Sequence, residues 1–141
     1  MNAYVFEEIA VGLTEGFEVT VTEEMFDRFL DITGDVNPLH NDAAFAQKKG
    51  HPARVAFGML TASFLSTLAG VYLPGKNSLI HEVEVKFAKP VYAGDVLKVS
   101  GTVSEVNETF RLFWMKVTVT NQRGEKVLRG KMRVGVLDER E

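Results

Sequence analysis

An aspartate and a histidine flank a forced bend in the segment GDVNPLHND, residues 34–42. Pro38 fixes its own φ and restricts Asn37 to extended conformations, so we expect Asp35 and His40 to lie on a rigid loop. Histidine titrates near neutral pH, and a neighbouring carboxylate can hold its tautomer and orientation. Such a pair can position a water molecule and exchange protons with it, which is general acid/base chemistry.

The same residues also have a purely structural interpretation. Asp and Asn side chains in loops commonly accept hydrogen bonds from nearby backbone N–H groups. In that case Asp35 and Asn37 only cap turns, and His40 is bonded to the backbone. The spacing of the residues does not by itself distinguish this interpretation from the acid/base pair.

The composition is that of one ordinary globular domain. Of the 141 residues, 45% are hydrophobic and 25% are charged, and the formal net charge is -3. A chain of this length can bury a core without disulfides or metals. Sixteen Lys and Arg against nineteen Asp and Glu argue against a nucleic-acid-binding surface. The absence of cysteine excludes disulfides, thiolate catalysis and cysteine-ligated zinc.

The sequence contains no recognisable targeting or metal-binding motif. The N-terminal segment MNAYVFEEIAVG lacks the basic start and apolar run of a secretory signal. No stretch approaches the ~18 apolar residues of a membrane helix. We therefore expect a cytoplasmic protein without a membrane span. The spacing of His40, Asp42 and His51 matches no established zinc site, so no metal is expected.

Helical periodicity dominates the first half of the chain. Thr22 offers helix-start chemistry, and helical spacing continues from it to Gly34. Asp42 can cap a second, short helix that ends at Gly50. The run GMLTASFLSTLAGVYL, residues 58–73, is apolar nearly all round. This pattern predicts a buried helix.

A period of two replaces the helical spacing after residue 77. Further alternating runs follow around 97–104, 110–120 and 127–137, and an early strand is expected near 16–21. These strands predict one antiparallel sheet wrapped around the 58–73 helix, in a single α+β domain spanning 1–141. In the first long strand the residues expected to share one face are Leu79, His81, Val83, Val85 and Phe87.

Three motifs together resemble those of one enzyme family. They are ITGDVNPLHND at 32–42, GMLTAS at 58–63 and VKFAKPVYAGDVL at 85–97. In type and order they are similar to the motifs of MaoC-like (R)-specific enoyl-CoA hydratases and dehydratases. The resemblance implies the hot-dog fold, a dimer or larger homo-oligomer, and an acyl-CoA substrate bound at the subunit interface. Coenzyme A would be part of the substrate, and no separate cofactor is implied.

The resemblance also implies roles for individual residues. Asp35 and His40 would be the catalytic pair that holds and polarises a water molecule, and Gly58 would donate a backbone N–H to the thioester oxygen. The expected reaction is reversible addition of water to a trans-2-enoyl-CoA, giving an (R)-3-hydroxyacyl-CoA. The expected substrate-binding residues are Asn37, which would brace the loop, and Met59, Leu60 and Ser63 on the helix.

Two other functions remain open on the same scaffold. A hot-dog thioesterase requires a carboxylate base on the central helix, and residues 58–73 contain no Asp or Glu. A non-catalytic acyl-binding subunit predicts a disrupted acid/base pair, whereas Asp35 and His40 are both present. One departure is Phe57, where many family members have histidine; we interpret it as a core or interface aromatic. Basic residues with potential reach to coenzyme A phosphates are Arg54, Lys86 and Lys89.

Overall fold

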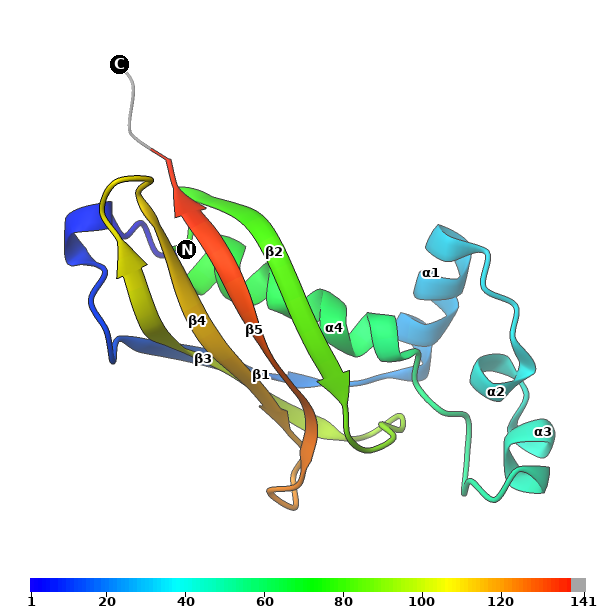
Figure 1. Ribbon diagram of the computed structural model, residues 1–141. Helices are drawn as coiled ribbons and strands as arrows, with labels where there is room; N and C mark the ends of the chain where they lie inside the picture. The colour runs from blue at the N-terminus through cyan, green and yellow to red at the C-terminus, as the bar shows by residue number, and fades with distance from the viewer. Residues whose placement is uncertain (138–141) are drawn as a thin grey trace.

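Within residues 1–137, five antiparallel strands form one sheet that curls around a helix (Figure 1). The computed structural model describes residues 1–137, so residues 138–141 of the expected domain lie outside the described residues. The strand order is β1-β3-β4-β5-β2. The predicted α+β hot-dog arrangement is therefore confirmed. The strands are β1 (Thr14–Thr20), β2 (Ser78–Phe87), β3 (Val96–Asn107), β4 (Leu112–Thr120) and β5 (Lys126–Val136).

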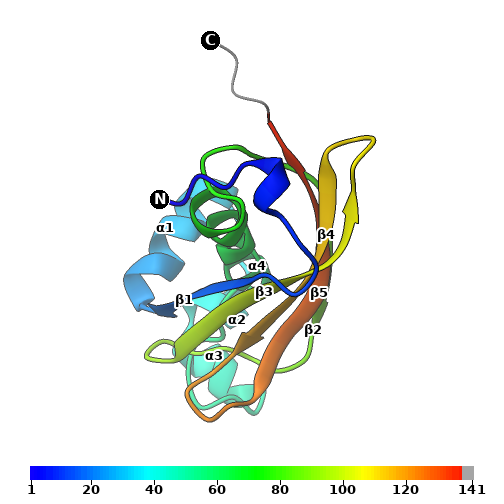
Figure 2. The ribbon, with the colours of Figure 1, turned by 90° about the vertical axis from the view of Figure 1, so that its left-hand side faces the viewer.

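The apolar helix lies in the hollow of the sheet, as the view in Figure 2 shows. It comprises α4 (Gly58–Thr67) and a π-helical turn, η2 (Leu68–Tyr72). Leu68 is fully buried against the sheet. A Cβ at Gly101 of β3 would meet Leu68 at 3.0 Å and Met115 at 2.8 Å, so the missing side chain allows close helix–sheet packing. The core-facing side chains of the strands thus cover one side of α4 and hold the helix in place.

The helix is central, as predicted, but a single copy of the chain does not bury it on every side. Met59 is 63% exposed, and Ser63 and Ser66 are also exposed. These residues are spaced four and three apart, so they form one stripe along the helix. The sheet covers only the opposite side. An apolar sequence therefore does not reveal that a single copy of the chain leaves this stripe uncovered.

A β-bulge in β2 also changes the predicted face of that strand. The register shifts between Ile80 and Glu82. Ile80 consequently pairs with Val134 and Val83 pairs with Met132, and both partners are fully buried in the core. Leu79 therefore lies on the other face from Val83, contrary to the strict alternation. A bulge inserts one extra residue, which a period-two pattern does not register.

Three helices form an excursion between β1 and α4, and they project beyond one end of the sheet (Figure 1). The first begins after Thr22, whose hydroxyl accepts the Met25 N–H, and ends at Gly34 in the left-handed region with φ 70°. Both limits agree with the prediction. Asp42 likewise caps the third helix by accepting the Phe45 N–H. The helices of this part are η1 (Phe6–Glu8) near the N-terminus, and α1 (Glu23–Thr33), α2 (Pro38–Asn41) and α3 (Ala43–Lys48) in the excursion.

Candidate active site

The Asp–His segment connects α1 to α2 through two side-chain caps. Asp35 Oδ1 accepts the Asn37 N–H at 3.1 Å, and Asn37 Oδ1 accepts the Leu39 N–H at 3.0 Å. Pro38 is the first residue of α2, so His40 lies on a helical turn and the expectation of a continuous loop is wrong there. Proline suits a first helical position because its missing N–H would have no partner in that turn.

Asp35 therefore does what the structural interpretation of the motif requires, but only one of its oxygens is engaged. Within residues 1–137 its Oδ2 has no hydrogen-bond partner, and the exposed side chain lines a cavity together with His40. Turn capping and a chemical role are thus compatible in one carboxylate. The cap holds the carboxylate in place, and the second oxygen remains available to a ligand or water.

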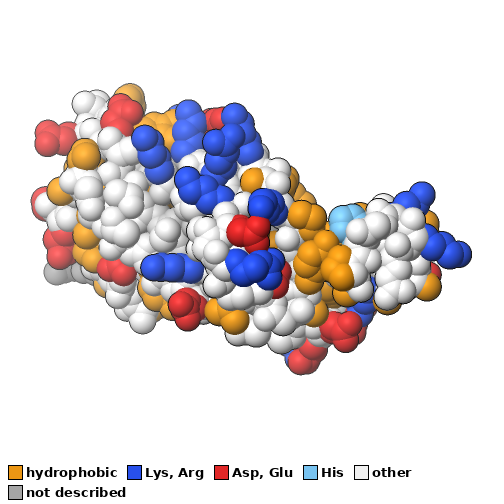
Figure 3. Space-filling model, turned by 90° about the horizontal axis from the view of Figure 1, so that it is seen from below, with side chains coloured by type: hydrophobic (Ala, Val, Ile, Leu, Met, Phe, Trp, Pro, Cys, Tyr) orange, Lys and Arg blue, Asp and Glu red, His pale blue; other side chains and the backbone are white. Residues whose placement is uncertain are grey.

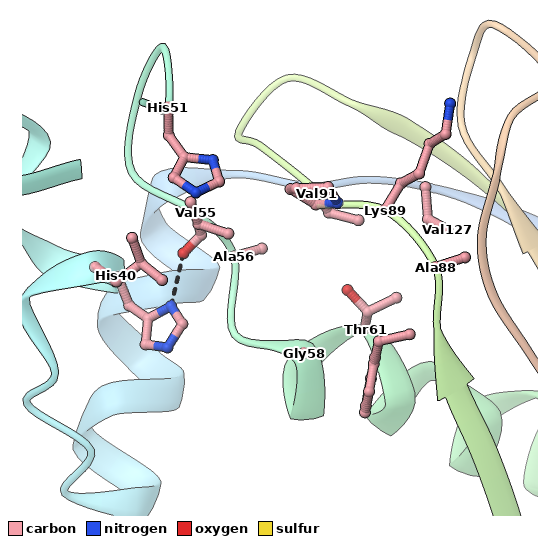
Figure 4. Close-up of a pocket in the computed structure, with 13 residues that line it drawn as sticks. His40, His51, Val55, Ala56, Gly58, Thr61, Ala88, Lys89, Val91 and Val127 are labelled. Atoms are coloured by element: carbon pink, nitrogen blue, oxygen red, sulfur yellow. Dashed lines mark hydrogen bonds between the residues drawn. The ribbon is translucent and has the colours of Figure 1, made fainter. Parts of the chain in front are cut away.

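His40 is held on two sides. Its Nδ1 lies 2.8 Å from the Val55 carbonyl oxygen (Figure 4). Because a carbonyl can only accept, Nδ1 must carry a proton, and in the neutral ring Nε2 is then the hydrogen-bond acceptor. The buried Phe57 ring stacks on the imidazole, with centroids 4.2 Å apart and planes at 28°. The ring is consequently oriented, with one nitrogen able to take a proton.

Arg54 anchors the turn that carries His40. Its Nε donates to the His40 carbonyl oxygen at 2.7 Å, and its guanidinium pairs with Asp27 of α1 at 2.9 Å. The Arg54 side chain is only 15% exposed. These contacts connect α2 to α1 and give Arg54 a positioning role.

Gly58 begins α4 beside the same cavity. Within the described part of the chain, the backbone N–H groups of Gly58 and Met59 have no acceptor, as expected for the first residues of a helix. Such groups carry partial positive charge and can stabilise an oxygen that becomes negative. A Cβ at Gly58 would meet the Phe87 ring at 3.1 Å. Glycine therefore keeps space open in front of the helix start.

Two adjoining cavities meet at His40, Gly58 and Phe87. We call the one that also contains Asp35 the Asp–His cavity; it measures about 400 Å³. The other measures about 380 Å³ and is called the Lys89 cavity after the lysine in its lining. Figure 3 shows hydrophobic side chains next to a histidine at the narrowing between the sheet and the helical excursion. The remaining residues lining the Asp–His cavity are Phe29, Thr33, Phe57 and Met59.

The other expected substrate-binding residues lie outside both cavities. Asn37 caps α2, Leu60 is in the core, and Ser63 is exposed on α4 with its hydroxyl donating to the Leu60 carbonyl oxygen at 2.6 Å. Phe87 lines both cavities but was expected only as a strand residue. Its position at the end of β2, directly before the AKP segment, is the available sequence signal.

A charged network lies beside the Lys89 cavity. Lys89 and Arg123 both donate to the Glu125 carboxylate, and Asn121 adds a third hydrogen bond. The hydrogen bonds from Lys89, Arg123 and Asn121 lower the pKa of Glu125 to about 2. His51 also lines the Lys89 cavity, and its Nδ1 lies 2.8 Å from the Tyr92 hydroxyl.

Burial raises the pKa of that Tyr92 hydroxyl, and the nearby Asp95 carboxylate raises it further. Tyr92 therefore remains protonated near neutral pH and can donate to His51. Elsewhere, residues 1–137 contain no group of three or more His, Cys, Asp or Glu arranged to hold a metal ion. None of the helices within this range is long and apolar enough to cross a membrane.

The curled sheet around α4 is the hot-dog fold, and Asp35 and His40 line a cavity beside the start of that helix. The chain belongs to the MaoC-like family, because the model of the MaoC like domain matches residues 9–125. An (R)-specific enoyl-CoA hydratase of Rhodospirillum rubrum is 30% identical over 131 residues, which are 93% of this chain and 90% of that protein.

Further comparisons agree with this family membership. A 3-hydroxybutyryl-CoA dehydratase of Methylorubrum extorquens is 35% identical over 101 residues, which cover 72% of this chain but only 64% of that protein. The solved R-hydratase of Pseudomonas aeruginosa superposes with a TM-score of 0.90 at 30% identity, covering 96% of this chain and 86% of that one. The (R)-hydratase of A. caviae superposes with a TM-score of 0.89 at 28% identity, covering 92% and 98%.

Proposed function

We propose that the protein is an (R)-specific enoyl-CoA hydratase, which adds water reversibly to a trans-2-enoyl-CoA. The observation that carries the proposal is that Asp35 and His40 line one cavity together with Gly58, whose N–H has no acceptor among the described residues. The names of the relatives support the thioester substrate and the (R) configuration of the product. Short acyl chains are the first substrates to test, because one relative is a 3-hydroxybutyryl-CoA dehydratase.

The proposed chemistry assigns one task to each group. Asp35 Oδ2 and His40 Nε2 hold a water molecule against C3 of the substrate. The water oxygen bonds to C3 as one of its protons passes to this pair, and the π electrons of the C2=C3 bond move toward the thioester oxygen. The N–H groups of Gly58 and Met59 stabilise that oxygen. C2 then takes up a proton from the pair, so water is added in full. General acid/base groups contribute about 10²–10⁴-fold.

The central experiment substitutes each member of the pair. Asp35→Asn preserves the shape and can still accept the Asn37 N–H, but removes the charge. His40→Ala removes the ring that can take the proton. Loss of the crotonyl-CoA enoyl absorbance should slow about 10²-fold or more in each variant, with a smaller change in KM. Because the two groups act on one water, the double variant should be little slower than the slower single variant.

Two outcomes would contradict this proposal. Hydration at the parent rate by folded Asp35→Asn would leave Asp35 as a turn cap only. Hydrolysis of the thioester, detected as free coenzyme A thiol, would instead indicate the thioesterase alternative. Circular dichroism and thermal unfolding of each variant control for misfolding.

We further propose that two copies pair along the β2 edge and the exposed stripe of α4. β2 is the last strand of the sheet and pairs only with β5 within the described chain. Val83 is 46% exposed, Phe87 53% and Met59 63%, although all three are apolar. An open strand edge beside exposed apolar side chains favours association, and homo-oligomers are mostly two-fold.

The dimer is tested by charging its centre. Val83→Asp should shift the mass measured by light scattering from two chains toward one and reduce hydration in parallel. The matched control is Val11→Asp, because Val11 is 67% exposed outside this surface. A parent protein that is monomeric at full activity would contradict the proposed dimer.

A further inference from the structure

Thr61 is a buried polar side chain that faces the Lys89 cavity. The residue is only 3% exposed, and its hydroxyl points into that cavity (Figure 4). Within residues 1–137 this hydroxyl has no hydrogen-bond partner, whereas the Thr33 and Ser63 hydroxyls each donate to a carbonyl in their own helix. Because this hydroxyl opens to the cavity and has no partner among the described residues, it is available to bond to a polar group of a ligand.

The polarity of the Lys89 cavity changes in a definite order. His40 and Gly58 lie where it meets the Asp–His cavity. Its middle has walls of buried aliphatic side chains and the single hydroxyl of Thr61. His51 and Lys89 line its other side, and Figure 4 shows them across the space from Gly58 and Thr61. The aliphatic wall residues are Val55, Ala56, Val91 and Val127.

We infer that the Lys89 cavity takes the pantetheine arm of the substrate and that the Thr61 hydroxyl bonds to an amide of this arm. The inference rests on the proposed function. A coenzyme A thioester presents, in order, the thioester, the amides and the phosphates. This order matches Gly58, Thr61 and the side of the cavity lined by His51 and Lys89, where the Lys89 ammonium is bonded to Glu125. An alkyl chain in the same cavity would leave the Thr61 hydroxyl without a hydrogen-bond partner, which is unfavourable.

The acyl chain then leaves Gly58 in the other direction, through the Asp–His cavity. Phe29, Phe57 and Met59 provide its apolar lining. Thr61 therefore recognises the thiol portion of the substrate and not the length of the acyl chain. This division gives the two cavities different specificities, which can be measured separately.

The test compares Thr61→Val, which replaces the hydroxyl by a methyl of similar size, with Thr61→Ser, which retains a hydroxyl. Crotonyl thioesters of coenzyme A, pantetheine and ethanethiol are the substrates, because the last has no amide. Thr61→Val should raise KM for the first two about 3- to 10-fold, the usual range for one hydrogen bond. It should leave kcat nearly unchanged and should not affect the ethyl thioester. The control is Thr67→Val, on the same helix and outside both cavities.

Three results decide the matter. A KM close to the parent value in Thr61→Ser, together with a raised KM in Thr61→Val, supports the hydrogen bond. An equal penalty on the ethyl thioester would show a merely structural role and overturn the inference. A changed ratio of crotonyl-CoA to octenoyl-CoA turnover, without dependence on the thiol portion, would identify the Lys89 cavity as the acyl pocket and also overturn it.

Calorimetric binding of free coenzyme A separates this inference from the proposed function. If the parent hydrates no enoyl thioester but Thr61→Val still weakens coenzyme A binding about 3- to 10-fold, the hydratase proposal fails and the pantetheine assignment stands. Unchanged coenzyme A binding in Thr61→Val would overturn the assignment while leaving hydratase activity intact.

Discussion

Gly58→Ala should separate catalysis from stability. A Cβ at Gly58 would lie 3.1 Å from the Phe87 ring, closer than the ordinary contact range of 3.4–4 Å. The Phe87 ring must therefore move by a few tenths of an ångström to accept the methyl group. Alanine is favoured over glycine inside helices by up to about 1 kcal/mol. The free energy of unfolding should therefore stay within about 1 kcal/mol of the parent value.

The activity of the same variant should fall far more. The new methyl group would occupy the junction of the two cavities, where the thioester oxygen must approach the Gly58 and Met59 N–H groups. Loss of one such donor costs about 10²–10³-fold in kcat, or roughly 2.7–4 kcal/mol of transition-state stabilisation. Crotonyl-CoA hydration and urea denaturation measure the two quantities on the same preparation.

Gly70→Ala is the matched control for this experiment. Gly70 lies in η2, and the nearest heavy atom to its added Cβ would be Ser78 Oγ at 3.9 Å, which is ordinary contact. This variant should be as stable as the parent or more so, and fully active. Parent-like kcat/KM in a folded Gly58→Ala protein would refute the assignment of the helix start as the oxyanion site.

Phe57→Leu should lower the free energy of unfolding by about 1–2 kcal/mol, since a buried aromatic contact is lost. It should also reduce kcat more than it raises KM, because His40 loses its stacking partner. An unchanged kcat would show that Phe57 does not orient the His40 ring. Glu125→Gln should lower Tm near neutral pH. The folded pKa of Glu125, about 2, is below its ordinary 4.5, so the stabilisation is present above 4.5 and is lost as the pH falls through about 2. The Tm difference between Glu125→Gln and the parent should thus become smaller as the pH is lowered. A difference that stays constant with pH would argue against a stabilising role of the Glu125 charge. Although Ser63 lies outside both cavities of a single chain, we expect the acyl path to continue past Met59 along α4, so Ser63→Leu should shift turnover toward shorter acyl chains. Unchanged selectivity in a folded variant would exclude Ser63 from the acyl path.

Local chemistry made much of the scaffold predictable from the sequence. Thr22, Gly34 and Asp42 begin or end helices through contacts with residues a few positions away. A short stretch of sequence is therefore enough to predict these helix limits. The strand-rich half follows from a period of two over long runs. The motif at 34–42 likewise indicated both the turn caps and the possible acid/base pair, because each depends on neighbouring residues.

The tertiary structure decided which of these side chains share a space. Val55 fixes the His40 tautomer, and Phe87 from β2 closes the junction in front of Gly58. The position of Thr61 in the apolar run 58–73 does not show in the sequence that its side chain differs in role from its neighbours. Among the residues described around the Lys89 cavity, only Thr61 directs a hydroxyl without a partner into it. Cavities form between elements that are distant along the chain, and burial depends on which side of a helix the sheet covers. The periodicity of the sequence predicts whether a segment is a helix or a strand and which of its residues are apolar. It does not predict which other element packs on each face, because that depends on the tertiary structure.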